Sequence, residues 1–98
     1  IRRACKKLNS YQLEGCIIYS SCEPCPMCLG AIYWARPLKL VFASPKEDAR
    51  NAGFDDELIY KEINKPHAHR KIIFEFLEIE NSKKPFEIWE KQESKIKY

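Results

Sequence analysis

Two cysteines three residues apart are the side chains of this sequence best suited to chemistry. They are Cys25 and Cys28, within the segment Cys22-Glu23-Pro24-Cys25-Pro26-Met27-Cys28. On a helix, residues at this spacing lie on one face with Cβ atoms about 5–6 Å apart, close enough to bind one tetrahedral zinc ion. Pro26 predicts that a helix begins here, because proline is favoured at the first helical position. The free N–H groups of that first turn would stabilise the thiolates that bind metal.

A cysteine pair of this kind has other interpretations. C-x-x-C alone could be a redox pair, or a structural pair in a small apolar pocket. The prolines favour metal, because Pro24-Cys25-Pro26-Met27-Cys28 fits the zinc-deaminase signature. In that signature P-C-x-x-C supplies two thiolates, and an upstream H-x-E supplies a third ligand and a proton-shuttling Glu. No H-x-E occurs in this sequence, so it holds two ligands where a catalytic zinc site typically has three.

The two histidines and the other cysteines are expected to have no metal role. His67 and His69 have no Glu in register, and they are predicted to lie in a solvated loop. The cysteines outside the pair are expected to be small buried side chains: Cys5, Cys16 and Cys22.

A strand, a helix and a second strand are predicted to position the cysteine pair. Residues 16–20 are a short apolar run, which predicts a strand that is buried on both faces and central in its sheet. The helix from Pro26 should stop at Arg36, because Pro37 cannot continue it. Residues 38–43 predict the second strand, and a helical connection between strands predicts that they are parallel. The expected fold class is therefore α/β.

The rest of the chain is expected to be less regular. Residues 1 to about 10 indicate the end of a helix, and residues 44–69 a polar, irregular segment with a short helix at 57–63. Residues 71–79 predict a third strand at a sheet edge, and Pro85 is expected to open a last helix that runs through Trp89. We expect one domain over residues 1–98, with earlier elements missing because Ile1 already stands inside an apparent helix.

Composition restricts the class of protein further. The 98 residues include 17 basic and 14 acidic ones, interspersed along the chain, for a formal charge of +3. Surfaces that bind nucleic acids usually carry clustered basic residues, so binding to nucleic acid is not expected. No window holds the roughly 18 apolar residues that span a bilayer. Five cysteines are an odd number and three of them lie within residues 22–28, which suits metal binding in a reducing compartment, and the cytoplasm is the expected location.

The residues resemble the guanine deaminases of the cytidine-deaminase-like superfamily. The likeness runs through Tyr11-Gln12-Leu13, residues 22–37, 52–56 and 59–63 to Tyr98. Residues 22–37 alone would indicate only the superfamily, and Tyr33-Trp34-Ala35-Arg36 together with Gly53-Phe54-Asp55-Asp56 narrows the resemblance. It implies a three-layer α/β/α fold with a central mixed sheet, whose N-terminal hairpin and first helices are missing from this chain.

The resemblance also implies a reaction. Cys25 and Cys28 match the zinc thiolates, and the catalytic Glu of a His-Ala-Glu motif would lie a few residues before Ile1. Zinc lowers the pKa of its bound water, and the resulting hydroxide attacks C2 of guanine to give xanthine and ammonia. The chain is expected to be inactive by itself, because the third ligand and the Glu are outside it.

Three residues match positions that bind substrate in guanine deaminases. Asp56 matches a carboxylate that reads the purine edge, Tyr98 a tail residue that closes the pocket, and Trp34 an aromatic in the pocket wall. From the residues alone, Asp56 could equally form a turn or cap a helix, and Trp34 could be a core side chain. The resemblance further implies a homodimer in which the C-terminal tail packs near the partner's pocket.

Two other functions remain open from the sequence. A tRNA adenosine deaminase shares the P-C-x-x-C core but needs a basic surface and room for an RNA loop. The interspersed acidic residues and a terminal aromatic favour a free base instead. A non-catalytic zinc-binding or protein-interaction module would use Cys25 and Cys28 in a closed site with two further ligands.

Overall fold

The computed structural model of the chain describes residues 1–96, which divide into two compact units. The first unit runs from Ile1 to Pro66, and the second begins at His67. Compact units of one chain can belong to a single domain, so one domain over residues 1–98 stays a prediction.

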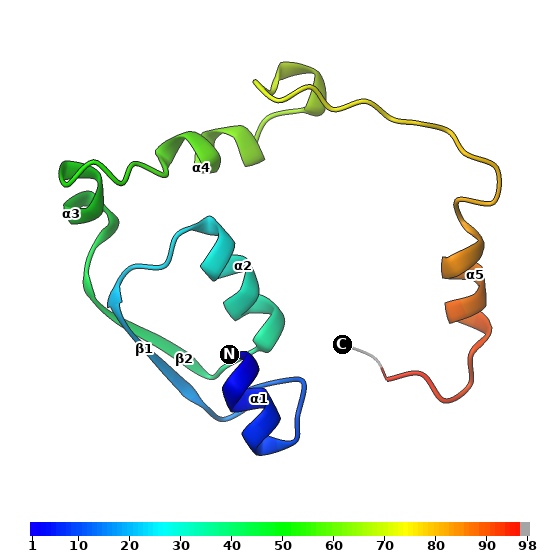
Figure 1. Cartoon of the computed structure of the whole chain (residues 1–98), viewed down its shortest axis with the longest axis horizontal. Coiled ribbons are helices and arrows are strands. Elements are labelled where there is room, and N and C mark those ends of the chain that lie inside the picture. Colours follow the sequence, from blue (N-terminus) through cyan, green and yellow to red (C-terminus); the bar gives the residue numbers. More distant parts are fainter. Residues whose placement is uncertain (97–98) are drawn as a thin grey trace. The chain divides into compact units, whose positions relative to one another are not determined.

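The first unit is organised around two strands and the helix that connects them. β1 (Ile17–Cys22) and β2 (Lys39–Ser44) pair in parallel, and α2 (Pro26–Ala35), which connects them along the chain, lies to one side of the pair (Figure 1). Arg36, with φ 51°, ends α2 directly before Pro37. The predicted βαβ unit is confirmed, and with it the α/β class.

The sheet of the described residues consists of β1 and β2, in a register that places Ile17 opposite Lys39 and Cys22 opposite Ser44. Exposed and half-buried residues alternate along β1, and Tyr19 is 75% exposed. The prediction of a central strand buried on both faces is therefore wrong for this part of the chain. There are two physical reasons: the described sheet has only two strands, so β1 is not central, and no described element covers the face of β1 that carries Tyr19.

The core of the described residues is small. The buried hydrophobic residues are Leu13 and Ala35, each 3% exposed, and the Leu13 N–H donates a hydrogen bond of 2.7 Å to the Ala35 carbonyl. α2 is apolar on every side, yet Met27 and Tyr33 are 79% and 75% exposed. Helices that are apolar all round are usually covered all round. The α2 sequence therefore suits more contacts than residues 1–96 supply.

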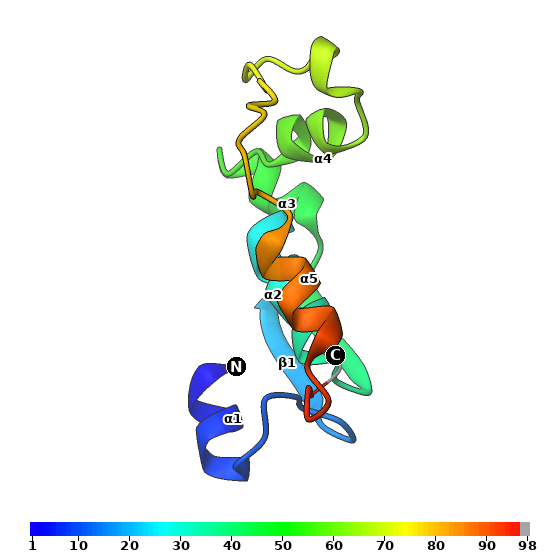
Figure 2. The same ribbon diagram turned by 90° about the vertical axis from the view of Figure 1, so that its right-hand side faces the viewer.

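Helices lie at both ends of the short sheet. α1 (Arg2–Leu8) lies at the end where β1 begins, and α3 (Lys46–Asn51) and α4 (Glu57–Ile63) follow β2 at the opposite end (Figures 1 and 2). The helices expected near the N-terminus and at 57–63 are confirmed. α3 is not anticipated by the sequence pattern, because it is almost entirely polar and shows no apolar periodicity. Glu47 and Asp48 in its first turn favour the helix electrostatically.

The second unit contains a 3₁₀ turn, η1 (His67–His69), and α5 (Lys84–Lys91). α5 confirms the predicted last helix, with Pro85 in its first turn. The predicted strand at residues 71–79 is wrong, since these residues form neither strand nor helix. A strand needs a neighbour to share backbone hydrogen bonds, and the described sheet has only β1 and β2. Within residues 1–96, no helix has the length and apolar character to cross a membrane.

Candidate metal centre

The cysteine pair stands at the start of α2, as its spacing predicts. Cys25 is the N-cap residue, and its carbonyl accepts a 2.8 Å hydrogen bond from the N–H of Leu29. Cys28 follows in the first turn. Cys25 is half-buried and Cys28 is exposed, and both are free thiols. The pair therefore lies beyond the carboxyl ends of the parallel strands, where α/β folds commonly place their ligand sites.

The electrostatics of the pair suit a cation. The backbone N–H of Cys28 hydrogen-bonds the Cys25 sulfur and lowers the pKa of that thiol. The pKa of Cys28 is raised, first by its side-chain hydrogen bond to Cys25 and then by the charge of Cys25. One thiolate is thus favoured and the second is opposed by the first. A bound divalent cation removes this opposition, because metal binding drives the deprotonation of its sulfur ligands.

These donors fit zinc as part of a ligand set. Two thiolates at a helix start are soft ligands of the kind that zinc prefers. Among residues 1–96, no group of three or more His, Cys, Asp and Glu side chains could hold a metal ion. Cys25 and Cys28 are therefore the two candidate zinc ligands that the described residues offer.

Residues 23–25, the metal loop, make three hydrogen bonds to other elements. The Glu23 N–H donates to the carbonyl of Ser44 at the end of β2, at 2.8 Å. The Glu23 carboxylate accepts from the N–H of Lys46 at 3.0 Å, and the Pro24 carbonyl accepts from the hydroxyl of Tyr60 at 3.5 Å. The sequence pattern does not single out Glu23 or Tyr60 for these contacts. The available signal is that Tyr60 follows Asp56 by one helical turn.

Asp56 lies close to the cysteine pair, at the N-cap of α4. Its negative charge opposes the lowering of the Cys25 pKa, so the carboxylate and the sulfur are near enough to interact. Its side chain makes no capping hydrogen bond. The neighbouring Asp55 accepts a 2.9 Å hydrogen bond from the N–H of Glu57 and approaches Arg50 to 3.7 Å. The helix-start role thus falls to Asp55 rather than to Asp56.

Asp56 also borders a polar cavity of about 260 Å³. In its wall, Glu57 pairs with Lys61 at 2.9 Å and with Arg50 at 3.3 Å. The hydrogen bond from Lys61, and then the charge of Arg50, lower the pKa of Glu57. Burial raises the pKa of Tyr60, and the charges of Asp56, Glu23 and Cys25 act in the same direction. The cavity is lined by Lys46, Arg50, Asp56, Glu57, Tyr60, Lys61 and Asn64.

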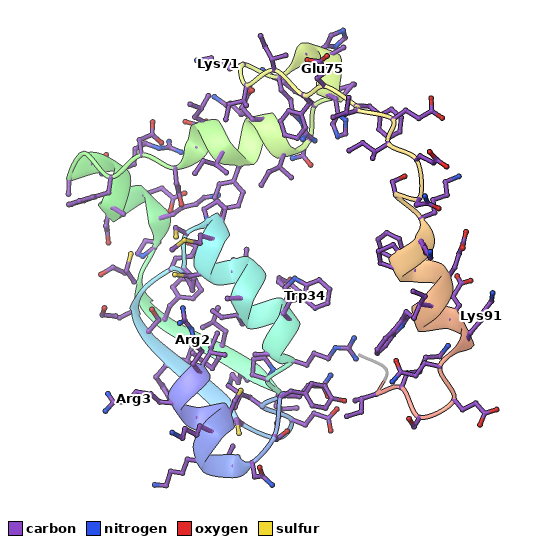
Figure 3. The ribbon with its side chains drawn as sticks, turned by 45° about the vertical axis from the view of Figure 1, so that its right-hand side comes forward. Arg2, Arg3, Trp34, Lys71, Glu75 and Lys91 are labelled. Atoms are coloured by element: carbon purple, nitrogen blue, oxygen red, sulfur yellow. The ribbon has the colours of Figure 1, made fainter. Side chains whose placement is uncertain are left out.

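The two other predicted site residues, Trp34 and Tyr98, are not placed beside the cysteine pair and Asp56 by the described structure. Trp34, near the end of α2, is 67% exposed and points away from the strands (Figure 3). Its place in a pocket wall stays a prediction. Tyr98 lies outside the described residues.

Within residues 1–96, the remaining cysteines and histidines do not join Cys25 and Cys28 in a group that could hold a metal ion. His67 and His69 are exposed as predicted, although η1 replaces the expected loop, and the His67 ring stacks on Phe74 at 4.8 Å. Three cysteines that the sequence predicts to be buried are only half-buried, because the described core is small: Cys5, Cys16 and Cys22.

Known proteins resemble this chain in both sequence and structure. Residues 1–44 match the cytidine and deoxycytidylate deaminase zinc-binding region. Guanine deaminase from Bacillus subtilis (strain 168) is 53% identical over 98 residues, which make up 100% of this chain and 63% of that protein. The X-ray structure of guanine deaminase from B. subtilis matches with a TM-score of 0.92, covering 100% of this chain and 62% of that one. The tRNA-specific adenosine deaminase from B. subtilis (strain 168) is 48% identical over 44 residues, 45% of this chain and 27% of that protein.

These matches bear on the fold and on the metal. The chain spans 63% of the length of the B. subtilis guanine deaminase. The TM-score of 0.92 confirms the cytidine-deaminase-like α/β class. The zinc-binding region contains both Cys25 and Cys28. The chain is therefore similar to guanine deaminase over its whole length, and its first 44 residues match the zinc-binding region of the cytidine and deoxycytidylate deaminases.

Proposed function

We propose that the protein is a zinc-dependent hydrolase that converts guanine to xanthine and ammonia. The similarity to guanine deaminase over all 98 residues carries this proposal. The tRNA adenosine deaminases match at lower identity: the B. subtilis protein is 48% identical over 44 residues, and the Aquifex aeolicus protein is 29% identical over 82 residues, against 53% over 98 residues for guanine deaminase. Asp56, which we assign to the base, lies beyond the zinc-binding region of residues 1–44. The similarity to guanine deaminase, at 53% identity, thus extends through the segment that would bind the base.

The chemistry of guanine suits the residues at the site. Cys25 and Cys28 would hold zinc, which when bound supplies the acidity that activates water at neutral pH. Guanine presents N–H donors at N1 and at its 2-amino group, and an ionised carboxylate such as Asp56 accepts hydrogen bonds only. Adenine carries an acceptor at N1, which would leave Asp56 and the base mismatched. Such an unpaired polar group in a closed site rejects the wrong base strongly.

A change of Asp56 tests the proposed function. We expect Asp56→Asn in the full-length protein to lower kcat/KM for guanine about 10- to 100-fold, because a charged hydrogen bond contributes about 1.5–3 kcal/mol. Zinc content should stay at the wild-type value, since Asp56 is assigned to the base and not to the metal. Xanthine formation by chromatography and zinc by elemental analysis measure the two effects.

The matched control is Asp48→Asn, an exposed carboxylate in the first turn of α3. It should leave kcat/KM unchanged. A wild-type protein that deaminates adenosine in tRNA but not guanine would reject the proposed substrate. An Asp56→Asn protein as active as wild type would remove Asp56 from the site.

We further propose that the protein is a homodimer whose C-terminal tail, with Tyr98, packs near the partner's pocket. α5 supports this, because it carries exposed apolar side chains in Phe86, 70% exposed, and Ile88, 60% exposed. The expected result of sedimentation equilibrium on the full-length protein is a dimer mass, and a monomer at every concentration would contradict it. All five cysteines are free thiols, which fits our proposal of a cytoplasmic protein.

A further inference from the structure

The proposed site is assembled from two helices. The metal pair lies at the start of α2, whereas Asp56 lies at the start of α4. The base held by Asp56 must keep a fixed position relative to the metal, since a misplacement of about 1 Å can lower a rate about 10²-fold. A contact that joins α4 to the metal loop would maintain this position.

The side chain of Tyr60 makes such a contact. Its hydroxyl donates a 3.5 Å hydrogen bond to the carbonyl of Pro24, the residue before Cys25. Tyr60 follows Asp56 by four residues, so the two lie on one face of α4. Asp56 and Cys25 both lie close enough to Tyr60 to act on it electrostatically. Tyr60 therefore joins the helix that follows Asp56 to the residue that precedes Cys25.

Lys46 and Glu23 support Tyr60 and the loop together. The ammonium of Lys46 lies 5.1 Å from the centre of the Tyr60 ring, within the range of a cation–π interaction. The N–H of the same lysine donates to the Glu23 carboxylate at 3.0 Å. One residue at the start of α3 thus contacts both α4 and the metal loop. This arrangement holds the tyrosine ring while leaving its hydroxyl directed at Pro24.

We propose that Tyr60 is a positioning residue that holds Asp56 in a fixed position relative to the Cys25–Cys28 metal site through its hydrogen bond to Pro24. The role rests on the proposed function, because the position of Asp56 affects the reaction only if Asp56 binds the base. Neither the zinc ligands nor the base needs direct contact with Tyr60.

Tyr60→Phe tests this role in the full-length protein, because it keeps the ring over Lys46 and removes only the hydroxyl. We expect kcat/KM for guanine to fall about 10- to 100-fold at unchanged zinc content. In an Asp56→Asn background, the same change should lower kcat/KM less than about threefold, because residues that act through one another are not additive. A general loss of stability would instead lower activity equally in both backgrounds. The control is Tyr19→Phe, which removes the hydroxyl of a 75% exposed tyrosine and should change neither value.

Hydrogen–deuterium exchange of the α4 amides, with zinc present, provides a measurement that does not require guanine. Tyr60→Phe should exchange faster in α4 than wild type, and Tyr19→Phe should not, because local opening follows the loss of local contacts. If the wild-type protein converts no guanine, the proposed function fails, and faster exchange still supports the docking of α4 by Tyr60. Unchanged exchange in α4, or equal losses of activity with and without Asp56, overturns the proposal.

Discussion

Cys25→Ala is expected to abolish both zinc binding and guanine deamination in the full-length protein. The change removes a thiolate at the helix start and also the partner that hydrogen-bonds Cys28. With one ligand fewer, the site no longer holds the metal that activates water, an effect of several kcal/mol on the transition state. Activity should fall more than about 10³-fold, since about 1.4 kcal/mol corresponds to tenfold. Elemental analysis and xanthine formation measure the two losses.

Cys22→Ala is the matched control for this change. Cys22 is a half-buried free thiol in the same motif, at the end of β1 rather than at the start of α2. Its replacement should keep the full zinc content and activity. A Cys25→Ala protein with one zinc per subunit and normal turnover would show that the motif does not bind the metal. Loss of zinc in both variants would indicate a general unfolding of the loop instead.

Residues 1–98 expressed by themselves are expected to convert no guanine, even with added zinc. The chain supplies two thiolates, and its two histidines belong to no H-x-E. Without a third ligand, the metal and its water have no defined position. Without the Glu, no group passes the proton to the leaving amine, and such acid–base help is typically worth about 10²–10⁴-fold. The two deficits together should place turnover below detection.

A hybrid enzyme gives this prediction its positive control. Residues 1–98 would replace the matching 63% of the B. subtilis guanine deaminase, and the remainder of that enzyme would stay in place. We expect the hybrid to form xanthine, because the exchanged segment is 53% identical. Turnover by residues 1–98 alone near the hybrid's rate would show that the chain holds every catalytic group. A folded hybrid that binds zinc without converting guanine would count against the proposed substrate.

Sequence reasoning succeeds here where a feature depends on neighbours along the chain. Pro26 following Cys25 starts α2 at the predicted place, and Arg36 with Pro37 ends it. The same local signals predict α4 to the residue and α5 to within two residues at each end. The parallel pairing of β1 and β2 follows as well, because a short helical connection permits little else.

Features that depend on distant partners are not predictable in this way. Residues 71–79 have the composition of a strand, but strand hydrogen bonds need a neighbour that the described residues do not provide. The burial of β1 fails for a related reason, because exposure depends on what covers each face. α3 is polar, and its helix start depends on charges in its first turn rather than on an apolar stripe.

The candidate site likewise has one part that depends on sequence neighbours and one part that depends on distant partners. The sequence by itself placed Cys25 and Cys28 together at a helix start, because a single helical turn brings them onto one face. Only the tertiary structure placed Asp56 near this pair, because Asp55, which is identical in type and adjacent in the chain, makes local contacts instead. Asp55 accepts the N–H of Glu57 and faces Arg50, whereas Asp56 lies within electrostatic reach of Cys25. The hydrogen bond from Tyr60 to Pro24 likewise depends on the tertiary structure, because it joins residues 36 positions apart in the chain.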